Sequence, residues 1–330
     1  MKTIYKLISV AFFIFQIFIV GLTQITVDIQ YYDNRDVPDE LYGFHMSNFF
    51  EQCVCYDPVS PGPPVDSIEQ CMGFAADLKP RVVRFPAGGD HKFMHLLDDN
   101  GYGYRESDID AFIDKKWVKV SDDGEIYDYI ERQNAIWEDI RFLDRFINFL
   151  DYCEAENGYK PKVIFVANIL LTKLTTLYDA GEIEHANLEA MRYLMDNDVE
   201  IIGIELGNEH YDDMDTTGVA IFKSGGSNAP KFNNYFQTCA NILDSLDSDP
   251  QFDTIPVALI AAPEPIHGSV TGLGSTKIGY YEDWNKDLKA KPTNPSTSVL
   301  FDAYVVHIYN RPDDLPECYR LYYDDYVITN

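Results

Sequence analysis

Basic residues are scarce in this sequence, and their scarcity limits the partners that the protein can bind. Of the 330 residues, 26 are lysine or arginine and 54 are aspartate or glutamate, so the formal net charge at pH 7 is −28. Such a charge repels phosphate backbones and anionic membrane surfaces. We therefore expect no nucleic-acid partner, and we interpret the acidity as a property that keeps the protein in solution.

Cysteine is also sparse, which argues against a fold held together by disulfides. The six cysteines are far less dense than those of a disulfide-stapled mini-protein, so any disulfides are accessory to the fold. Cys53 and Cys55 could suggest a metal, but no histidine pair lies nearby to complete a site, which favours a disulfide or free thiols. Asp212, Asp213 and Asp215 could bind calcium, although a solvated charge cluster is commoner. We expect no metal and no other cofactor.

Long apolar runs are absent beyond residue 22, so no second segment resembles a membrane span. Lys2 and Lys6 precede an uncharged apolar run over residues 7–22, which Thr23 and Gln24 follow. This order is typical of a signal peptide, here residues 1–23. The run is shorter than the roughly 20 apolar residues that a spanning helix needs, and an uncleaved anchor or a lipid attachment is the alternative. The mature chain is then secreted, extracellular or periplasmic, without stable insertion into a membrane.

A low-complexity linker is absent beyond residue 25, so residues 24–330 are predicted to form one α/β domain. Apolar strand-like runs alternate with amphipathic helical stretches, as in βαβ units around a parallel sheet. The predicted strands cover residues 41–46, 81–86, 163–168, 200–206, 257–262 and 301–308. The predicted helices cover residues 65–78, 136–152, a stretch that includes 188–194, and 235–246. Long polar loops are expected after the second and fifth strands. The predicted class is a (β/α)8 TIM barrel, of which about six βα units are present.

Polar residues gather where the predicted strands end. They are His45, residues 84–90, Asn168, residues 208–210, Glu264 and residues 307–309. In a βα barrel every loop that follows a strand lies on one face, and barrel enzymes hold their catalytic groups there. A barrel with only a structural role needs no such polarity at one end. The pattern therefore predicts an active site at the carboxyl ends of the strands.

Glu209 is the candidate for the central catalytic group. Glycoside hydrolysis needs one protonated carboxyl group, which donates to the leaving oxygen, and a second ionised carboxylate. An aromatic, partly dry strand end favours the protonated form of a carboxyl group. The adjacent Asn208 could bond a sugar hydroxyl. An Asn-Glu pair usually marks a helix cap or a loop, but here it ends a buried strand, which favours Glu209 as the proton donor.

Three of these strand ends carry patterns that occur together in a known family. Residues 205–209 (ELGNE) match a fourth-strand pattern of an acidic residue, an apolar residue, Gly, Asn and Glu. Residues 84–89 (RFPAGG) match a second-strand pattern Arg-aromatic-Pro-Gly-Gly with an inserted alanine, and residues 307–309 (HIY) follow the sixth strand. Over roughly residues 40–310 the chain thereby resembles the retaining (β/α)8-barrel glycosidases called clan A. Among these it is most similar to the α-L-arabinofuranosidase and heparanase-like branches.

The resemblance implies a secreted retaining glycosidase that acts on a plant, algal or microbial polysaccharide, with Glu209 as general acid/base. It further implies that Arg84 holds the carboxylate of the nucleophile and that His307 and Tyr309 line the site nearby. The alternatives are that Arg84 pairs with Glu205 inside the barrel, that His307 is a core histidine and that Tyr309 only packs. The predicted substrate-binding residues are Asn208, Arg84, His307, Tyr309, Asn168 and His45.

The sequence departs from the family pattern at the nucleophile, which is a glutamate near the end of the seventh strand. Residues 321–330 (LYYDDYVITN) fit either the start of a sixth helix or a short strand that ends at Asn330. In the second case an asparagine stands where the glutamate belongs. We favour a fragment of a longer product with the nucleophile beyond residue 330, because an open six-stranded array leaves two unpaired edges. Glu264 is a poor substitute. The alternative function is a carbohydrate-binding pseudoenzyme barrel.

Aromatic residues are abundant in the stretches that are predicted as long loops. They are Tyr102, Tyr104, Trp117, Tyr280, Tyr281 and Trp284. Because sugars present apolar C–H faces that stack on aromatic rings, these side chains are expected to shape the subsites. The alternative is that they anchor the loops to the barrel.

Overall fold

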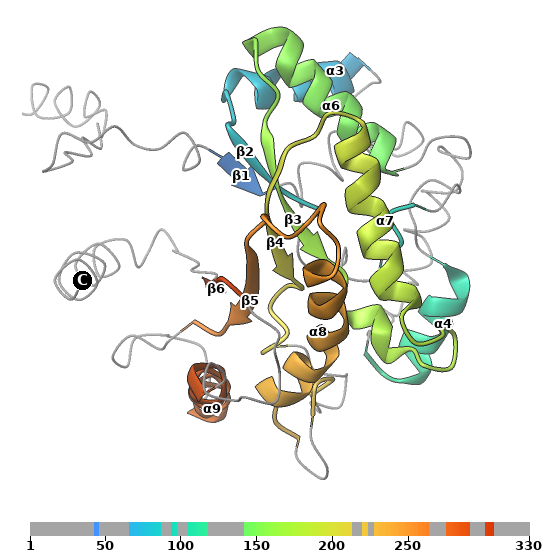
Figure 1. The fold of residues 1–330 in the computed structure, drawn as a ribbon, viewed down its shortest axis with the longest axis vertical. Coiled ribbons are helices and arrows are strands. Elements are labelled where there is room, and N and C mark those ends of the chain that lie inside the picture. Colours follow the sequence, from blue (N-terminus) through green and yellow to red (C-terminus); the bar gives the residue numbers. More distant parts are fainter. Residues whose placement is uncertain are drawn as a thin grey trace, which may run out of the picture. The chain divides into compact units, whose positions relative to one another are not determined.

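The described residues form a parallel six-stranded sheet whose strands are joined by helices (Figure 1). The computed structural model describes residues 43–45, 66–86, 94–97, 105–117, 142–212, 220–223, 228–263, 275–290 and 301–306, all within one compact unit that spans residues 39–330. Each neighbouring pair of strands is parallel. The strands are β1 (Gly43–His45), β2 (Val82–Phe85), β3 (Lys162–Ala167), β4 (Ile201–Leu206), β5 (Val257–Ala261) and β6 (Ala303–Val306). The predicted α/β class and the places of the six strands are confirmed.

Four helices lie where the sequence predicts them. They are α3 (Asp66–Asp77), α6 (Phe142–Asn157), α7 (Glu182–Asp196) and α8 (Phe232–Asp247), of which α6 ends later than predicted. A short 3-10 helix, η4 (Leu170–Lys173), follows β3. Two further helices, α4 (Glu106–Asp114) and α9 (Ser275–Ala290), lie in the stretches after β2 and β5. The prediction of loops in these two places is wrong.

Both unexpected helices carry apolar stripes that are too short or too narrow to predict a helix from the sequence. The helix α9 buries Tyr281, Trp284 and Leu288 at helical spacing, but polar and charged residues fill most of its remaining positions. The helix α4 has only 9 residues, and its buried side includes the acidic Asp108 beside apolar side chains. A stripe that is so narrow or so short gives little periodic signal against the background of a polar segment.

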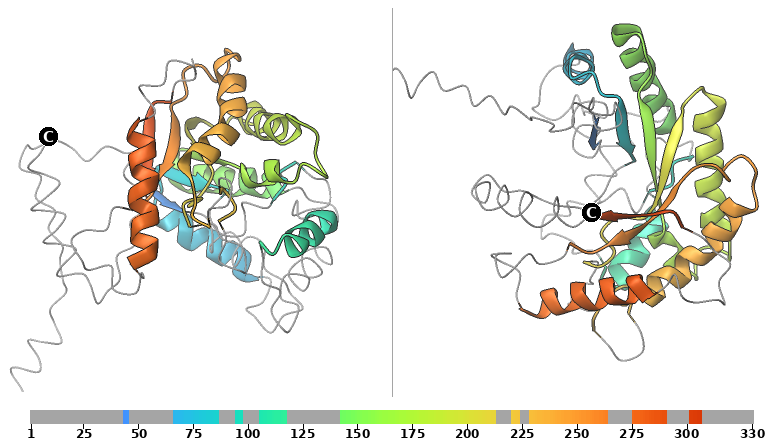
Figure 2. Two further views of the ribbon diagram at one scale, coloured as in Figure 1. Left: turned by 90° about the horizontal axis from the view of Figure 1, so that it is seen from below. Right: turned by 60° about the vertical axis from the view of Figure 1, so that its left-hand side comes forward.

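The strand order follows the chain order, so the described sheet is wound in one direction. A doubly wound sheet reverses its order at a switch point, and the six described strands show no reversal. The order of the helices matches the order of the strands. The helix α3 packs on α6, α6 on α7, α7 on α8, and α8 on α9. Figure 2 shows these helices following the strands in an arc. Among the described residues β1 and β6 do not pair with each other, so this part of the chain is an open sheet.

The core lies between the helices and one face of the sheet. Phe85 of β2 stacks on Phe146 of α6, with their ring centroids 3.7 Å apart. On the opposite face Ile164 is only half-buried, and Arg84 and Glu205 place their charged groups there. The charges of the sheet thus lie on the face away from the helices. The buried side chains on the helix-covered face include Val83, Phe85, Val163, Phe165, Ile204, Leu206 and Leu259.

Two helices use an asparagine to bind the backbone at the point where a strand ends. Asn187 of α7 accepts from the backbone N–H of Asn168 at 2.7 Å and donates to its carbonyl oxygen at 2.9 Å. Asn285 of α9 makes the same pair of bonds with Ala262, at 2.9 and 2.8 Å. Each amide satisfies backbone groups that no longer have a neighbouring strand as partner. The pairs therefore fix where the loops after β3 and β5 begin.

Candidate functional site

Arg84 of β2 links the carboxyl ends of β2 and β4. Its Nε and Nη2 atoms lie 2.7 and 2.6 Å from Oε2 of Glu205, and Nη2 donates to Oδ1 of Asn208 at 3.0 Å. The side chains of Arg84 and Glu205 are only 14% and 7% exposed, so the ion pair is shielded from bulk water. The pairing is the alternative that the sequence leaves open for Arg84. A contact between Arg84 and a nucleophile stays a prediction.

The same contact sets the orientation of the Asn208 side chain. Its carbonyl oxygen accepts from Arg84, and the residue is 3% exposed. Because the oxygen accepts from Arg84, the amide nitrogen is the end of the side chain that carries hydrogen-bond donors for another partner. The structure thus brings together Arg84, Asn208 and the adjacent Glu209, three of the predicted site residues.

Glu209 occupies a tight turn that directly follows β4. Its φ is +50°, in the left-handed region that residues with a Cβ seldom adopt, and Gly207 has a φ of +94°. The backbone N–H of Asp212 donates to the carbonyl oxygen of Glu209 at 2.8 Å and closes the turn. Glu209 is half-buried, whereas its neighbours Asn208 and His210 are buried. The turn therefore presents Glu209 at the carboxyl edge of the sheet while it anchors the residues on either side.

Tyr281 of α9 brings a hydroxyl group to the same turn. It bonds to Asp212, and burial, the charge and hydrogen bond of Asp212 and the charge of Glu209 all raise the pKa of Tyr281. The hydroxyl therefore stays protonated at physiological pH and serves as a donor beside two carboxylates. Sequence reasoning missed this role, because the only signal was an aromatic residue in a segment that was not predicted to be helical.

Buried aromatic side chains hold the strand ends that adjoin the turn. The hydroxyl of Tyr235 on α8 donates to the carbonyl oxygen of Leu206 at 2.6 Å and accepts from the N–H of Ile260 at 3.1 Å, so it joins the ends of β4 and β5. Trp284 donates from Nε1 to the carbonyl oxygen of Ile260 at 2.9 Å. Trp284 and Tyr281 are 0% and 5% exposed. The prediction that these two residues lie in a loop is wrong, because both belong to α9, and their burial in the core supports the alternative that they pack against the barrel.

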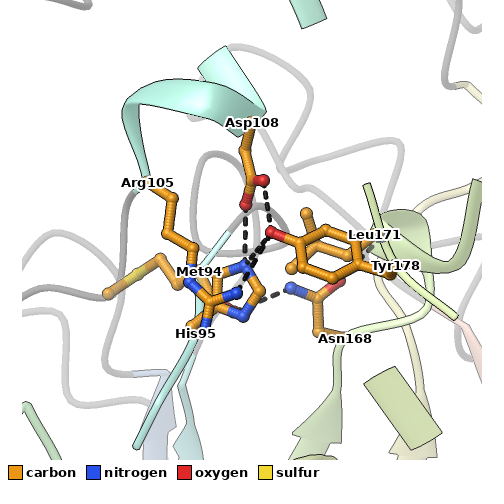
Figure 3. Close-up of polar contacts among 7 residues, drawn as sticks. All are labelled: Met94, His95, Arg105, Asp108, Asn168, Leu171 and Tyr178. Carbon is orange, nitrogen blue, oxygen red and sulfur yellow. Dashed lines mark hydrogen bonds and ion pairs between the residues drawn. The ribbon is translucent and has the colours of Figure 1, made fainter. Parts of the chain in front are cut away.

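Asn168, a predicted substrate contact, has both ends of its side chain engaged by the protein. Its Nδ2 donates to the carbonyl oxygen of Met94 at 2.8 Å, and its Oδ1 accepts from the N–H of Leu171 at 3.3 Å (Figure 3). The first bond connects the end of β3 to residues 94–97, which belong to the long segment between β2 and α6, and the second is local to the segment after β3. This geometry supports a structural task for Asn168, and substrate contact by its side chain stays a prediction.

A buried cluster of His95, Asp108 and Tyr178 lies beside Asn168 (Figure 3). His95 Nε2 is 2.7 Å from Oδ2 of Asp108 and 2.9 Å from the hydroxyl of Tyr178, which itself donates to Oδ1 of Asp108. The three residues are 7%, 0% and 8% exposed. Arg105 lies over the Tyr178 ring at 5.6 Å. Because His95, Asp108 and Tyr178 come from three separate segments, no sequence motif predicts the cluster.

A cavity of about 20 Å³ adjoins this cluster. That volume accommodates a single water molecule but not a sugar ring, since small-molecule sites span several hundred cubic ångströms. The hydrogen bonds of the cluster tie α4 and residues 94–97 to the segment after β3, and this cavity has no room for a sugar ring. The cavity is lined by Met94, His95, Leu96, Asn168, Leu171, Ile183, Ala186 and Asn187.

Several predicted site residues lie outside the part of the chain that the structure describes. The side chain of His45 on β1 is outside the description, as are His307, Tyr309, Glu264 and the whole predicted signal peptide. Among the residues that are described, no group of three or more His, Cys, Asp or Glu side chains could hold a metal ion. In the same part of the chain no helix has the length and apolar character of a membrane span. No protein-family model, curated protein or solved structure matches the chain.

Proposed function

We propose that the chain is part of a secreted retaining glycosidase that cleaves O-glycosidic bonds of a plant, algal or microbial polysaccharide, with Glu209 as the general acid/base. One observation carries the proposal: the turn after β4 leaves Glu209 half-buried and buries the residues beside it. A carboxyl group that acts on a bound sugar needs this combination of access and fixed position.

We further propose that the sheet is part of a (β/α)8 barrel, closed by βα units outside the described residues. The support is topological. Six parallel strands follow one another in chain order, and each helix of the arc packs on the next. The ion pair of Arg84 and Glu205 lies on the sheet face away from the helices, which in a closed barrel is the interior.

In this proposal Glu209 acts twice. It first donates its proton to the glycosidic oxygen as the bond to the anomeric carbon breaks, and a second carboxylate attacks that carbon to form a glycosyl-enzyme. Glu209, now ionised, then removes a proton from the water that hydrolyses this intermediate. In retaining glycosidases the two carboxyl groups are about 5 Å apart, and here the second one is expected from outside the described residues. The amide nitrogen of Asn208 donates to a sugar hydroxyl.

A non-catalytic carbohydrate-binding barrel is the second candidate, and one observation favours it. The other carboxylates described near the turn are already occupied, Glu205 by Arg84 and Asp212 by Tyr281. Glu205 is also only 6% exposed, so its carboxylate has little access to a bound sugar. If no further carboxylate reaches the site, the same turn and the same Asn208 can hold a sugar without cleaving it.

The test is Glu209→Gln in the full-length protein, assayed on unactivated oligosaccharides and on activated aryl glycosides such as 4-nitrophenyl α-L-arabinofuranoside. Loss of the acid lowers kcat/KM on unactivated substrates by about 10²- to 10⁴-fold. The loss on aryl glycosides is smaller in the first step, because a nitrophenolate leaves without a proton. Unchanged turnover of an unactivated substrate contradicts the proposal.

Glu200→Gln is the matched control, because Glu200 precedes β4 at the opposite end of the strand and its side chain is 63% exposed. It should hydrolyse both kinds of substrate like the unaltered protein. A full-length protein that cleaves no glycoside but binds oligosaccharide in calorimetry supports the carbohydrate-binding candidate instead.

A further inference from the structure

The residue after Glu209 is a histidine that is completely buried, although it lies in a turn outside the strands and helices. His210 is 0% exposed. Its ring lies directly on the α-carbon of Gly207: a Cβ atom at position 207 would lie 2.0 Å from Nε2 and 2.4 Å from Cδ2 of His210. Real Cβ atoms are not found so close to other atoms, so position 207 must be glycine while the ring stays in place. The two residues therefore form one steric unit.

Two aromatic rings also lie beside the His210 ring. The centroid of the His210 ring lies 4.8 Å from that of Phe222 and 5.6 Å from that of Tyr235. Tyr235 is itself fixed by its bonds to the backbones of β4 and β5. The ring thus occupies a slot between the glycine and side chains that belong to the core.

Gly207 and His210, which form this contact, flank the catalytic candidate Glu209 in the sequence. Gly207 and His210 enclose Asn208 and Glu209, so contact between the first pair sets the path of the backbone through the second. Glu209 adopts the left-handed conformation there, with φ at +50°. Such a conformation is unfavourable for a residue with a side chain and persists only where the surroundings impose it. Arg84 holds Asn208 from the opposite side.

We propose that His210 is the positioning residue of Glu209: packing of its ring on Gly207 holds the turn in the conformation that points the Glu209 carboxyl group at the substrate. The inference rests on the proposed glycosidase function. It assigns His210 no contact with the sugar and no proton transfer. Its effect on the reaction passes entirely through the backbone of residues 207–210.

The first test is His210→Ala in the full-length protein, assayed on the glycosides that the unaltered protein hydrolyses. Misplacement of Glu209 lowers kcat by about 10²-fold while KM changes little, because the groups that bind sugar are retained. Leu150→Ala, in the buried part of α6, is the control for a core cavity distant from the turn. It should lower the melting temperature as well but leave kcat unchanged. Equal effects of both variants on kcat overturn the inference.

The second test asks whether Gly207 and His210 act through their mutual contact. Gly207→Ala should lower kcat strongly, because the added methyl group overlaps the ring and because the φ of +94° at this position is unfavourable for alanine. In the double variant Gly207→Ala with His210→Ala the overlap is gone and only the backbone strain at position 207 remains, so the loss in kcat should be smaller than the product of the two single losses. Losses that simply multiply show that the two positions act independently and overturn the inference.

A structural readout separates this inference from the proposed function. Hydrogen exchange of the Asp212 amide, which bonds to the carbonyl oxygen of Glu209, should accelerate in His210→Ala and not in Leu150→Ala. A crystal structure of His210→Ala that retains the positive φ of Glu209 contradicts the positioning role even if no glycoside is ever cleaved. An active protein that depends on Glu209 but tolerates His210→Ala refutes the inference and leaves the glycosidase proposal intact.

Discussion

At the scale of single residues, Arg84 makes the most consequential contacts near the turn. It neutralises Glu205, which is nearly buried, and it orients Asn208 next to Glu209. A buried ion pair need not stabilise a fold relative to apolar side chains of the same volume. Its disruption is costly because the remaining charge has no partner and little water. The same arginine therefore affects both the stability of the sheet and the shape of the site.

Replacement of Arg84 by methionine should lower the free energy of unfolding by about 3–5 kcal/mol, because Glu205 is then buried without a counter-charge. The measurement is urea-induced unfolding at pH 7. In the double variant Arg84→Met with Glu205→Leu no charge is left behind, so most of the lost stability should return. A double variant that is no more stable than Arg84→Met would show that the ion pair is not the reason for the loss.

At the scale of elements, the sequence predicts what apolar patterning determines and misses what depends on long-range pairing. The strands β3, β4 and β5 are predictable because nearly every position in them is apolar. The helices α4 and α9 are not, because buried Asp108 interrupts the apolar side of one and few apolar residues mark the other. In the site, Glu209 and Asn208 follow from their place after a buried strand. The contribution of Tyr281 depends on α9, which sequence patterns do not reveal.

The cluster around α4 illustrates the same limit. Its members His95, Asp108 and Tyr178 come from a segment after β2, from α4 and from the segment after β3, so no spacing within the sequence relates them. Each has an ordinary interpretation when taken alone. Only the fold shows that a carboxylate with no exposure receives hydrogen bonds from the other two. The cluster ties α4 to the segment after β3 at the carboxyl side of the sheet.

Tyr178→Phe should loosen this connection, because the variant removes the hydroxyl that donates to the buried Asp108. A buried acceptor that loses a partner costs about 1–3 kcal/mol, which urea unfolding measures. Hydrogen exchange should accelerate in α4 and in residues 94–97. Tyr159→Phe is the control, since the Tyr159 hydroxyl donates to the carbonyl oxygen of Lys79 at an exposed position. A Tyr178→Phe protein with unaltered exchange in α4 would show that the cluster does not hold this helix.

At the scale of the whole molecule, the fold buries several groups that ionise only in alkaline solution. Burial is the largest cause that raises the pKa of Tyr178, Tyr235 and Tyr281 above the usual value for tyrosine. Burial also raises the pKa of the Cys153 thiol to about 12 and that of the Cys239 thiol still further. All five groups are neutral in the folded protein at pH 7, so the fold buries no charge at these positions.

The protein should therefore lose stability as the pH rises above about 9. In the unfolded chain the thiols lose their protons near pH 8.5 and the tyrosines near pH 10, whereas the folded protein retains them. The folded state then binds more protons than the unfolded state, so the free energy of unfolding falls with increasing pH. Each group contributes a slope of up to about 1.4 kcal/mol per pH unit while it is ionised only in the unfolded chain.

Urea unfolding at intervals from pH 7 to 11 measures this slope, and absorbance at 295 nm reports tyrosinate in the native protein. Cys153→Ala leaves one thiol fewer to ionise and should reduce the slope between pH 8.5 and 10. A free energy of unfolding that stays constant or rises from pH 9 to 11 would mean that these side chains are not protonated and buried together in the native state.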